Sequence, residues 1–142
     1  MASRLNPYLA FDGKAREALE FYRDVLGGTL TTTTYAEGGM EHDPADADKV
    51  MHGQLENESG YTLMASDAPS GQPAEPMANV QISLSGDNAS DAELSGYWDK
   101  LAARGSIVVP LEAAPWGDKF GMVTDPYGVL WMVNIAGPGQ PA

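Results

Sequence analysis

The feature of this sequence that most limits its fold is an order of predicted elements that occurs twice along the chain. Each half has a strand, then a helix whose apolar residues recur at helical spacing, then three more strands. In the first half these elements are predicted at residues 7–11, 13–26, 29–35, 50–55 and 61–65. In the second half they are predicted at residues 79–85, 91–104, 106–111, 119–124 and 129–134. The repeat predicts an α+β protein made of two tandem βαβββ modules with curled mixed sheets.

Residues at the helix ends support this assignment. Asp12 or Gly13 is expected to cap the first helix. Ser90 and Glu93 have the spacing of a capping box at the start of the second helix. Gly105 is expected to end that helix, because glycine readily adopts the conformation found just past a helix C-terminus.

The loops divide the chain further. The sequence predicts a first module over about 3–66, a linker over about 67–77 and a second module over about 78–136. A Gly- and Asp-rich loop at 36–48 is interpreted as a solvated connection, with a mobile lid as the alternative. The acidic run in this loop, which begins at Glu41–Asp43, lacks the spacing of a calcium-binding loop.

Composition excludes several classes of protein. The 142 residues fit one domain with a sizeable core. The formal net charge of −12 argues against binding to nucleic acid and disfavours anionic membranes. The chain has no cysteine, so disulfides and thiolate metal sites are excluded. No apolar run approaches the ~20 residues of a membrane span and no signal peptide is evident, so we expect a cytoplasmic protein.

Five stretches of the sequence resemble one known superfamily. The helix ending Phe21–Gly27 and the turn Asp125–Gly128 are similar to those of the vicinal oxygen chelate superfamily, which includes glyoxalase I, bleomycin resistance proteins and extradiol dioxygenases. The stretches Leu5–Leu9, Lys49–Gly53 and Trp116–Met122 resemble its PhnB-like branch. The resemblance implies a single glyoxalase-like domain over residues 1–142, sheets that enclose a cavity for a small organic ligand, and a homodimer.

The resemblance also permits a test for the metal site of this superfamily. Its metalloenzymes place His, Gln or Glu side chains inward from the first and last strands of each module. Counting from the motifs, these positions fall near Pro7, at Met64, around Val80 or Gln81, and at Met132. Proline has no side-chain ligand and methionine is a poor partner for a hard ion. We therefore expect neither a metal nor another cofactor.

Side chains on the concave face of the first predicted sheet are candidates for chemistry. Strand alternation places His52 and Gln54 on one face, together with Met64 of the next strand. His52 is the candidate catalytic residue, because an imidazole can move a proton near neutral pH. The alternative is a histidine that is hydrogen-bonded in a half-buried sheet. Met64 and Met132 are interpreted either as the floor of an apolar pocket or as core filler.

A second candidate region lies in the second module. Trp116 and Phe120 could supply aromatic contact area at the mouth of a pocket. Asp118 lies between them and could bind the ligand or only fix the loop. Trp131 alternates with Met132 and is expected in the core under the helix.

Three hypotheses of function remain open at this point. The first is a metal-free protein that binds a small organic molecule, as bleomycin-binding relatives do. The second is an enzyme of lyase, transferase or dioxygenase type, acting on a small metabolite or its thiol adduct. It would use His52 as acid or base, with Gln54 and Asp118 orienting the substrate, or an unrecognised metal site. The third is an interaction module whose cavity is filled by its own side chains.

Overall fold

The computed structural model describes residues 3–39, 41–72 and 80–139, and it divides the chain into two compact units, Met1–Glu75 and Pro76–Ala142. Each unit contains one βαβββ module, so the predicted repeat and the α+β class are confirmed. No helix within the described residues is long and apolar enough to cross a membrane.

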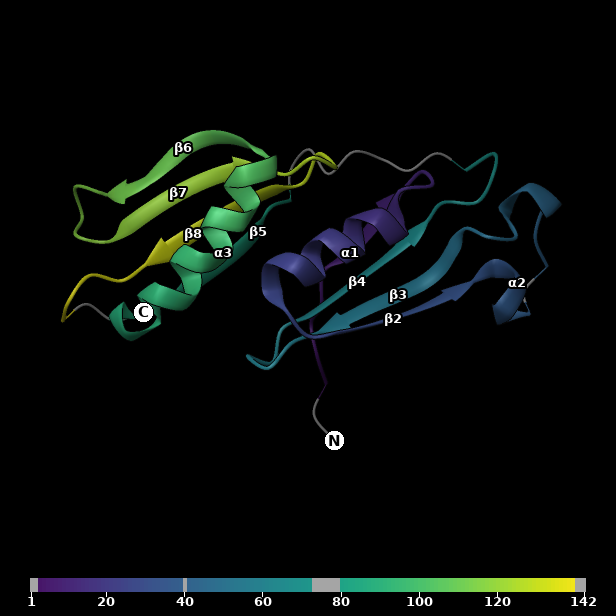
Figure 1. Ribbon diagram of the computed structural model, residues 1–142, viewed down its shortest axis with the longest axis horizontal. Coiled ribbons are helices and arrows are strands. Elements are labelled where there is room, and N and C mark those ends of the chain that lie inside the picture. Colours follow the sequence, from purple (N-terminus) through teal and green to yellow (C-terminus); the bar gives the residue numbers. More distant parts are fainter. Residues whose placement is uncertain (1–2, 40, 73–79, 140–142) are drawn as a thin grey trace. The chain divides into compact units, whose positions relative to one another are not determined.

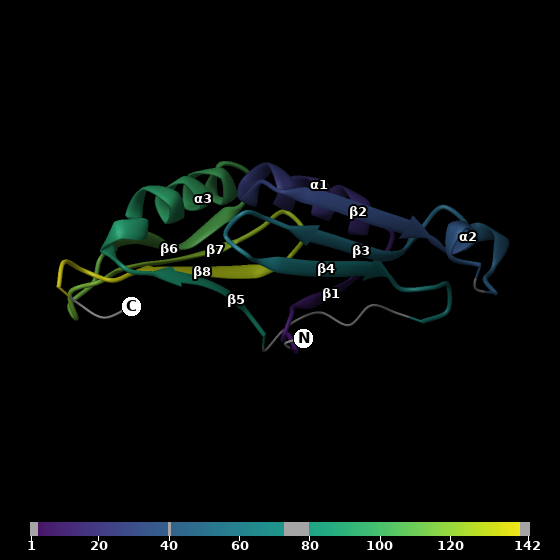
Figure 2. The same cartoon turned by 90° about the horizontal axis from the view of Figure 1, so that it is seen from below.

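The first unit is a four-stranded sheet with one long helix on one face (Figures 1 and 2). Its elements are β1 (Tyr8–Phe11), α1 (Ala15–Leu26), β2 (Thr29–Thr34), α2 (Tyr35–Gly38), η1 (Pro44–Asp46), β3 (Val50–Glu56) and β4 (Thr62–Asp67). The strand order is β1-β4-β3-β2, in which β1 and β4 are parallel and the other pairs are antiparallel. Among the described residues of this unit, α1 covers one face of the sheet and no helix covers the other (Figure 2).

The second unit repeats this arrangement. Its elements are β5 (Ile82–Gly86), η2 (Asn88–Ser90), α3 (Asp91–Arg104), β6 (Ser106–Ala113), β7 (Lys119–Thr124) and β8 (Leu130–Ile135). The order is β5-β8-β7-β6, with the parallel pair again formed by the first and last strands of the module. Asn79, the predicted start of β5, lies outside the described residues, as do residues 73–77 of the predicted linker.

Close packing explains why glycine occupies the same place in both sheets. A Cβ on Gly53 of β3 would lie 2.3 Å from Cδ1 of Leu19 in α1. A Cβ on Gly121 of β7 would lie 2.8 Å from Cη2 of Trp98 in α3. In each unit, glycine lets a large apolar side chain of the helix approach the centre of the sheet. The helix-facing core therefore sits between α1 or α3 and its own sheet.

Two of the predicted caps were wrong. Lys14 is the N-cap residue of α1, and the backbone N–H of Ala15 donates to Oδ1 of Asp67 at 2.9 Å. Asp67 is only 2% exposed, and its Oδ2 accepts from the N–H of Val50 at 3.0 Å. A buried carboxylate from the end of β4 thus replaces the local cap, since it satisfies one of the donors that every helix start leaves unpaired.

At α3, Ser90 is the N-cap residue but its side chain makes no capping hydrogen bond to the helix. Its N–H and hydroxyl both donate to Oδ1 of Asp87, which closes the short helix η2 instead. The predicted capping box with Glu93 is therefore absent, because the Ser90 hydroxyl is hydrogen-bonded to the carboxylate of Asp87 instead. Gly105 does end α3, as predicted, and its N–H donates to the carbonyl of Leu101.

The turn before β8 forms as the sequence predicts. The N–H of Gly128 donates to the carbonyl of Asp125, and Gly128 has a φ of 88° that favours glycine. Asp125 is buried, and its carboxylate accepts from the N–H groups of Tyr127 and Val129 and from Nε1 of Trp131. The aspartate of this turn therefore also anchors the buried tryptophan of β8.

Candidate ligand-binding site

The face of the first sheet that turns away from α1 is polar. Buried Leu55 and Leu63 pair across β3 and β4 on the helix side. Gln54 pairs with Met64 on the other side, and Tyr8 of β1 is the cross-strand partner of Met64. The alternation of side chains thus brings His52, Gln54 and Met64 to one surface, as the strand pattern predicted, and adds Tyr8.

Tyr8 and His52 are in direct contact on this surface. Oη of Tyr8 lies 3.1 Å from Nδ1 of His52, and the two ring centroids are 5.7 Å apart. Because Tyr8 is in β1 and His52 is in β3, the phenol reaches across β4. When the phenol donates to Nδ1, a neutral imidazole carries its proton on Nε2. The arrangement can therefore present an oriented donor or acceptor to a ligand on an accessible face.

Tyr8 was not among the residues that sequence reasoning selected. The sequence did contain a pattern that could have identified Tyr8. It alternates with Leu9 and Phe11, which are buried under α1. Tyr8 itself is exposed. A phenol on the polar face of a strand whose other face is apolar marks a candidate contact residue.

The corresponding face of the second sheet carries several large apolar side chains. Met132 pairs with Met122 across β7 and β8, and Phe120 lies two residues from Met122 on the same face of β7. Polar side chains share this face, because Asn134 is the cross-strand partner of Phe120 and Ser83 of β5 is the partner of Met132. Trp131, by contrast, is buried under α3, where the alternation predicted it. The two modules therefore share a backbone plan but present different chemistry on their open faces.

A pocket of about 250 Å³ lies beside Phe120. Its walls are the end of β6, the following loop and two aromatic side chains: Val109, Pro110, Glu112, Ala113, Ala114, Pro115, Trp116 and Phe120. The ring centroids of Trp116 and Phe120 are 5.9 Å apart in an edge-to-face arrangement. The structure thus brings together the two aromatic residues that the sequence singled out.

Asp118 has a structural role in this loop. Its Oδ2 accepts from Nδ2 of Asn134 at 3.0 Å, and its Oδ1 accepts from the N–H of Gly137 at 3.1 Å. Its carbonyl also accepts from the N–H of Ala114. Both carboxylate oxygens therefore tie the loop that carries Trp116 to β8 and the segment after it. This arrangement matches the interpretation in which Asp118 fixes the loop.

The positions that face each other across the parallel strand pairs do not fit a hard divalent ion. In the first unit they are Tyr8 and Met64, and in the second they are Ser83 and Met132. Neither pair contains a carboxylate or an imidazole, the side chains that such ions prefer. Tyr8 and Ser83 follow Pro7 and Gln81, near which counting from the motifs placed the first-strand positions, by one and two residues.

Within residues 3–39, 41–72 and 80–139, no group of three or more His, Asp or Glu side chains could hold a metal ion. We therefore derive no chemistry through a metal.

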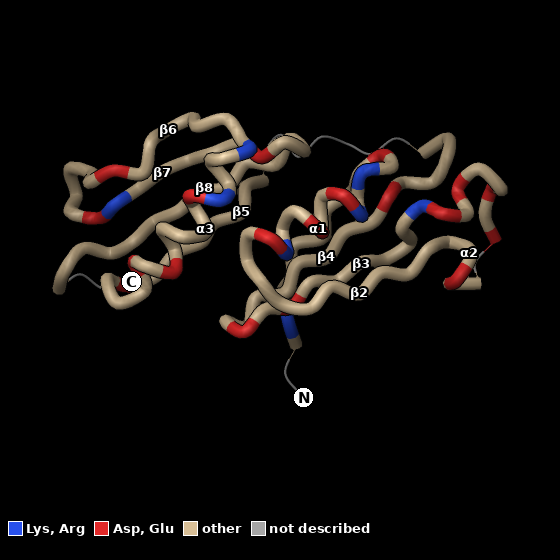
Figure 3. The backbone as a smooth tube through the Cα atoms, viewed as in Figure 1, with Lys and Arg blue, Asp and Glu red and all other residues tan. Residues whose placement is uncertain are grey.

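The predicted loop over 36–48 includes most of α2 and all of η1, and Figure 3 shows several acidic positions along it. Asp46 is only 1% exposed, and its carboxylate accepts from the N–H and hydroxyl of Ser70 and from Nζ of Lys49. These bonds, first of all that from the Ser70 hydroxyl, lower the pKa of Asp46 to about 2. The expectation of a wholly solvated acidic loop was wrong for this residue.

Comparison with known proteins identifies the family. The model of the Glyoxalase/Bleomycin resistance protein/Dioxygenase superfamily matches residues 4–133. Protein YjdN of Escherichia coli strain K12 is 30% identical over 143 residues, which cover 92% of this chain and 94% of YjdN.

Solved structures agree with this assignment. Protein PA1353 from Pseudomonas aeruginosa is 39% identical with a TM-score of 0.81, covering 96% of this chain and 99% of that one. A PhnB protein from Bacillus cereus, 23% identical, shares the fold with a TM-score of 0.71, covering 94% of this chain and all of the other. The chain therefore belongs to the glyoxalase, bleomycin resistance protein and dioxygenase superfamily, as its motifs predicted.

Proposed function

We propose that this protein binds a small organic molecule without the help of a metal ion. The observation that carries the proposal is the 250 Å³ pocket in which Trp116 and Phe120 meet at 5.9 Å. Concave, mostly apolar pockets with aromatic walls and few polar groups are typical ligand sites. Membership of a superfamily that includes bleomycin resistance proteins agrees with such a role.

The lining of the pocket limits the ligand. Its apolar walls favour an aromatic or alicyclic group, because burial of apolar surface drives binding. The carboxylate-bearing Glu112 is also part of the lining. Since a second negative charge beside a carboxylate is disfavoured, we expect neutral or cationic ligands to bind better than anionic ones.

The open face of the first sheet supports the proposal with polar groups. The hydrogen-bonded Tyr8–His52 pair and the amide of Gln54 can donate to or accept from a ligand. Met64 supplies a polarizable apolar surface beside them. We therefore propose Gln54 and Met64 as ligand contacts on the first unit and, separately, Met132 as a ligand contact on the second unit.

Tryptophan fluorescence offers a direct test. Trp116 is 59% exposed, whereas Trp98 and Trp131 are 7% and 1% exposed, so acrylamide should quench Trp116 preferentially. We would screen neutral, cationic and anionic aromatic compounds, including bleomycin, for protection of Trp116 from quenching. Trp116→Ala and Phe120→Ala should weaken binding of a confirmed ligand by about tenfold or more, as loss of an aromatic anchor generally does. Titration calorimetry would measure these affinities, because Trp116→Ala removes the fluorescent reporter.

Two controls make this test decisive. Val80→Ala removes an exposed apolar side chain of the second unit that lies outside both the pocket and β6, and it should leave affinity unchanged. Affinities that are insensitive to both aromatic substitutions would refute the proposed site. Metal analysis of the purified protein tests the other half of the proposal, because one stoichiometric, protein-held divalent ion would overturn it.

A second candidate function is favoured by the 3.1 Å contact between Tyr8 and His52. A phenol that orients an imidazole is an arrangement suited to general acid or base catalysis on a small metabolite or its thiol adduct. His52→Ala should abolish turnover in such an enzyme but leave a passive binder largely functional. Tyr8→Phe should lower kcat and change its pH profile if the phenol orients the imidazole.

The proposal also includes a homodimer that acts in the cytoplasm. Its support is the edge strand β6, on which Ile107, Val108 and Val109 are all exposed. Exposed apolar side chains on an edge strand are typical of surfaces that pair with another chain. Light scattering on the purified protein tests this point, and a monomer at micromolar concentration would contradict it.

A further inference from the structure

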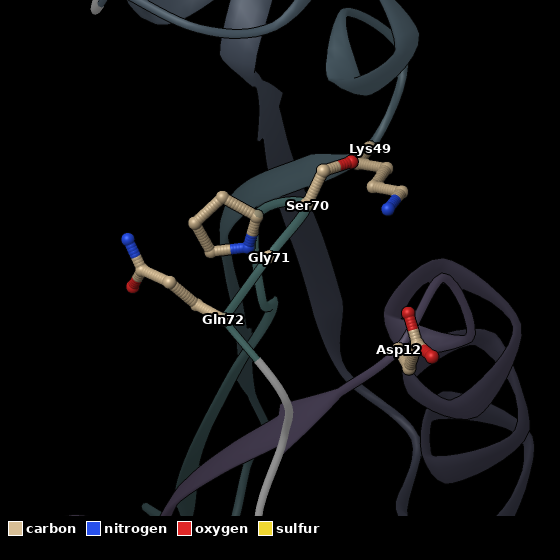
Figure 4. Close-up of a pocket in the computed structure, with 6 residues that line it drawn as sticks. Asp12, Lys49, Ser70, Gly71 and Gln72 are labelled. Carbon is tan, nitrogen blue, oxygen red and sulfur yellow. The ribbon is translucent and has the colours of Figure 1, made fainter.

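A second pocket, of about 360 Å³, lies in the first unit near the start of α1 (Figure 4). Its walls come from the turn before α1, the residue before β3 and the segment after β4: Asp12, Lys49, Pro69, Ser70, Gly71 and Gln72. None of these residues is on the open face of the sheet. The pocket is therefore separate from the surfaces considered above.

One wall of this pocket is held in place by a buried carboxylate. Asp46 accepts from the N–H of Ser70 at 2.9 Å and from its Oγ at 2.7 Å. The N–H of Gln72 donates to the carbonyl of Pro69, which closes a turn around Gly71 with a φ of 82°. The wall from Pro69 to Gln72 is thus a fixed turn. A preformed wall lowers the ordering cost of binding.

The pocket contains one group of each charge. Nζ of Lys49 lies 3.1 Å from Oδ1 of Asp46, and an ammonium has three donors, so further donors remain for a ligand. The bond to Asp46, with smaller effects from Asp12 and Asp67, raises the pKa of Lys49. Asp12 is exposed at the same pocket, and Figure 4 shows it and Lys49 opposite Gln72.

We propose that this pocket binds a small zwitterion, in which an ammonium group pairs with Asp12 and a carboxylate pairs with Lys49. The side-chain amide of Gln72 can donate to or accept from the rest of the molecule. The inference does not depend on the proposed function, because it concerns a different pocket and a different ligand chemistry.

The charges around the pocket explain why a zwitterion is preferred. Asp12 and Lys49 present opposite charges to the same pocket. A ligand with only a carboxylate would be repelled by Asp12, and a ligand with only an ammonium would be repelled by Lys49. A molecule with both groups satisfies Asp12 and Lys49 together.

The test compares zwitterions with probes that carry a single charge. Glycine, β-alanine and 4-aminobutyrate would be titrated against the full chain, with butyrate and butylammonium as single-charge probes. Amide chemical shifts of Gly71 and Gln72 report binding at the pocket, and Trp116 fluorescence reports the other site. At least one zwitterion should shift Gly71 and Gln72 saturably and bind roughly fivefold more tightly than either single-charge probe.

Substitutions separate direct contact from the general field. Asp12→Asn should weaken zwitterion binding roughly fivefold, whereas Asp48→Asn, an equal charge change at an exposed residue outside the pocket, should have less than about a twofold effect. Gln72→Ala, a second variant at an exposed position, removes the proposed amide contact and should also weaken zwitterion binding. Equal effects of Asp12→Asn and Asp48→Asn, single-charge probes that bind as tightly, or no saturable shift with any probe would overturn the proposal.

Discussion

Asp67 offers the sharpest prediction about stability. Its carboxylate is 2% exposed and accepts two backbone N–H groups, from Ala15 at the start of α1 and from Val50 at the start of β3. One side chain at the end of β4 thus joins three elements of the first unit. At the place in the second unit that corresponds by strand pairing, the residue is the apolar Ile135. The carboxylate is therefore a feature of the first module rather than a general need of the fold.

The expected cost follows from these bonds. Asp67→Asn keeps the shape but leaves one acceptor, so one of the two N–H groups faces an amide donor. An unsatisfied buried donor costs about 1–3 kcal/mol. Asp67→Ala removes both acceptors and should cost about 2–6 kcal/mol. Asp12→Asn, which changes the same charge at an exposed position, should change stability by no more than about 0.5 kcal/mol.

Urea unfolding and hydrogen exchange would measure these effects. The free energy of unfolding should fall in the order Asp12→Asn, Asp67→Asn, Asp67→Ala, and exchange protection should decrease first at the amides of Ala15 and Val50. An Asp67→Ala loss below about 0.5 kcal/mol with an unchanged denaturant slope would refute the assigned role. Unchanged protection of both amides would refute it independently.

Two further predictions concern packing and pH. Gly121→Ala should destabilise the protein by about 1–3 kcal/mol, because the new Cβ would lie 2.8 Å from Cη2 of Trp98. Gly96→Ala in α3 should instead stabilise the protein by about 0.5–1 kcal/mol, because its new Cβ meets no atom within 4 Å. Urea midpoints would compare the pair, and shifts of equal sign would contradict the packing argument. The hydrogen bonds from Ser70 lower the pKa of Asp46 from 3.8 to about 2, so its stabilising effect is present above about pH 4 and is lost as pH falls through 2. Asp46→Asn should therefore destabilise the protein at pH 7, and this difference should shrink between pH 4 and pH 2; a difference that stays constant would contradict the assignment.

Much of the fold and part of the candidate site could be predicted from the sequence because they depend on local patterns. The period of two in β3 and β4 correctly assigned Leu55 to the helix side and Gln54 and Met64 to the open side. Turn chemistry correctly located the Asp125–Gly128 turn, since its preferred residues act within four positions. The pairing of Trp116 and Phe120 follows from their closeness in the chain.

The tertiary structure decided what depends on residues far apart in the chain. Asp67 caps a helix that begins 52 residues earlier, and Tyr8 meets His52 across an intervening strand. No local pattern encodes these partners, because cross-strand register and the burial of a carboxylate are fixed only when distant segments pack. The polar first sheet and the zwitterion pocket beside Asp12 arise in the same way, from side chains that only the folded chain brings together.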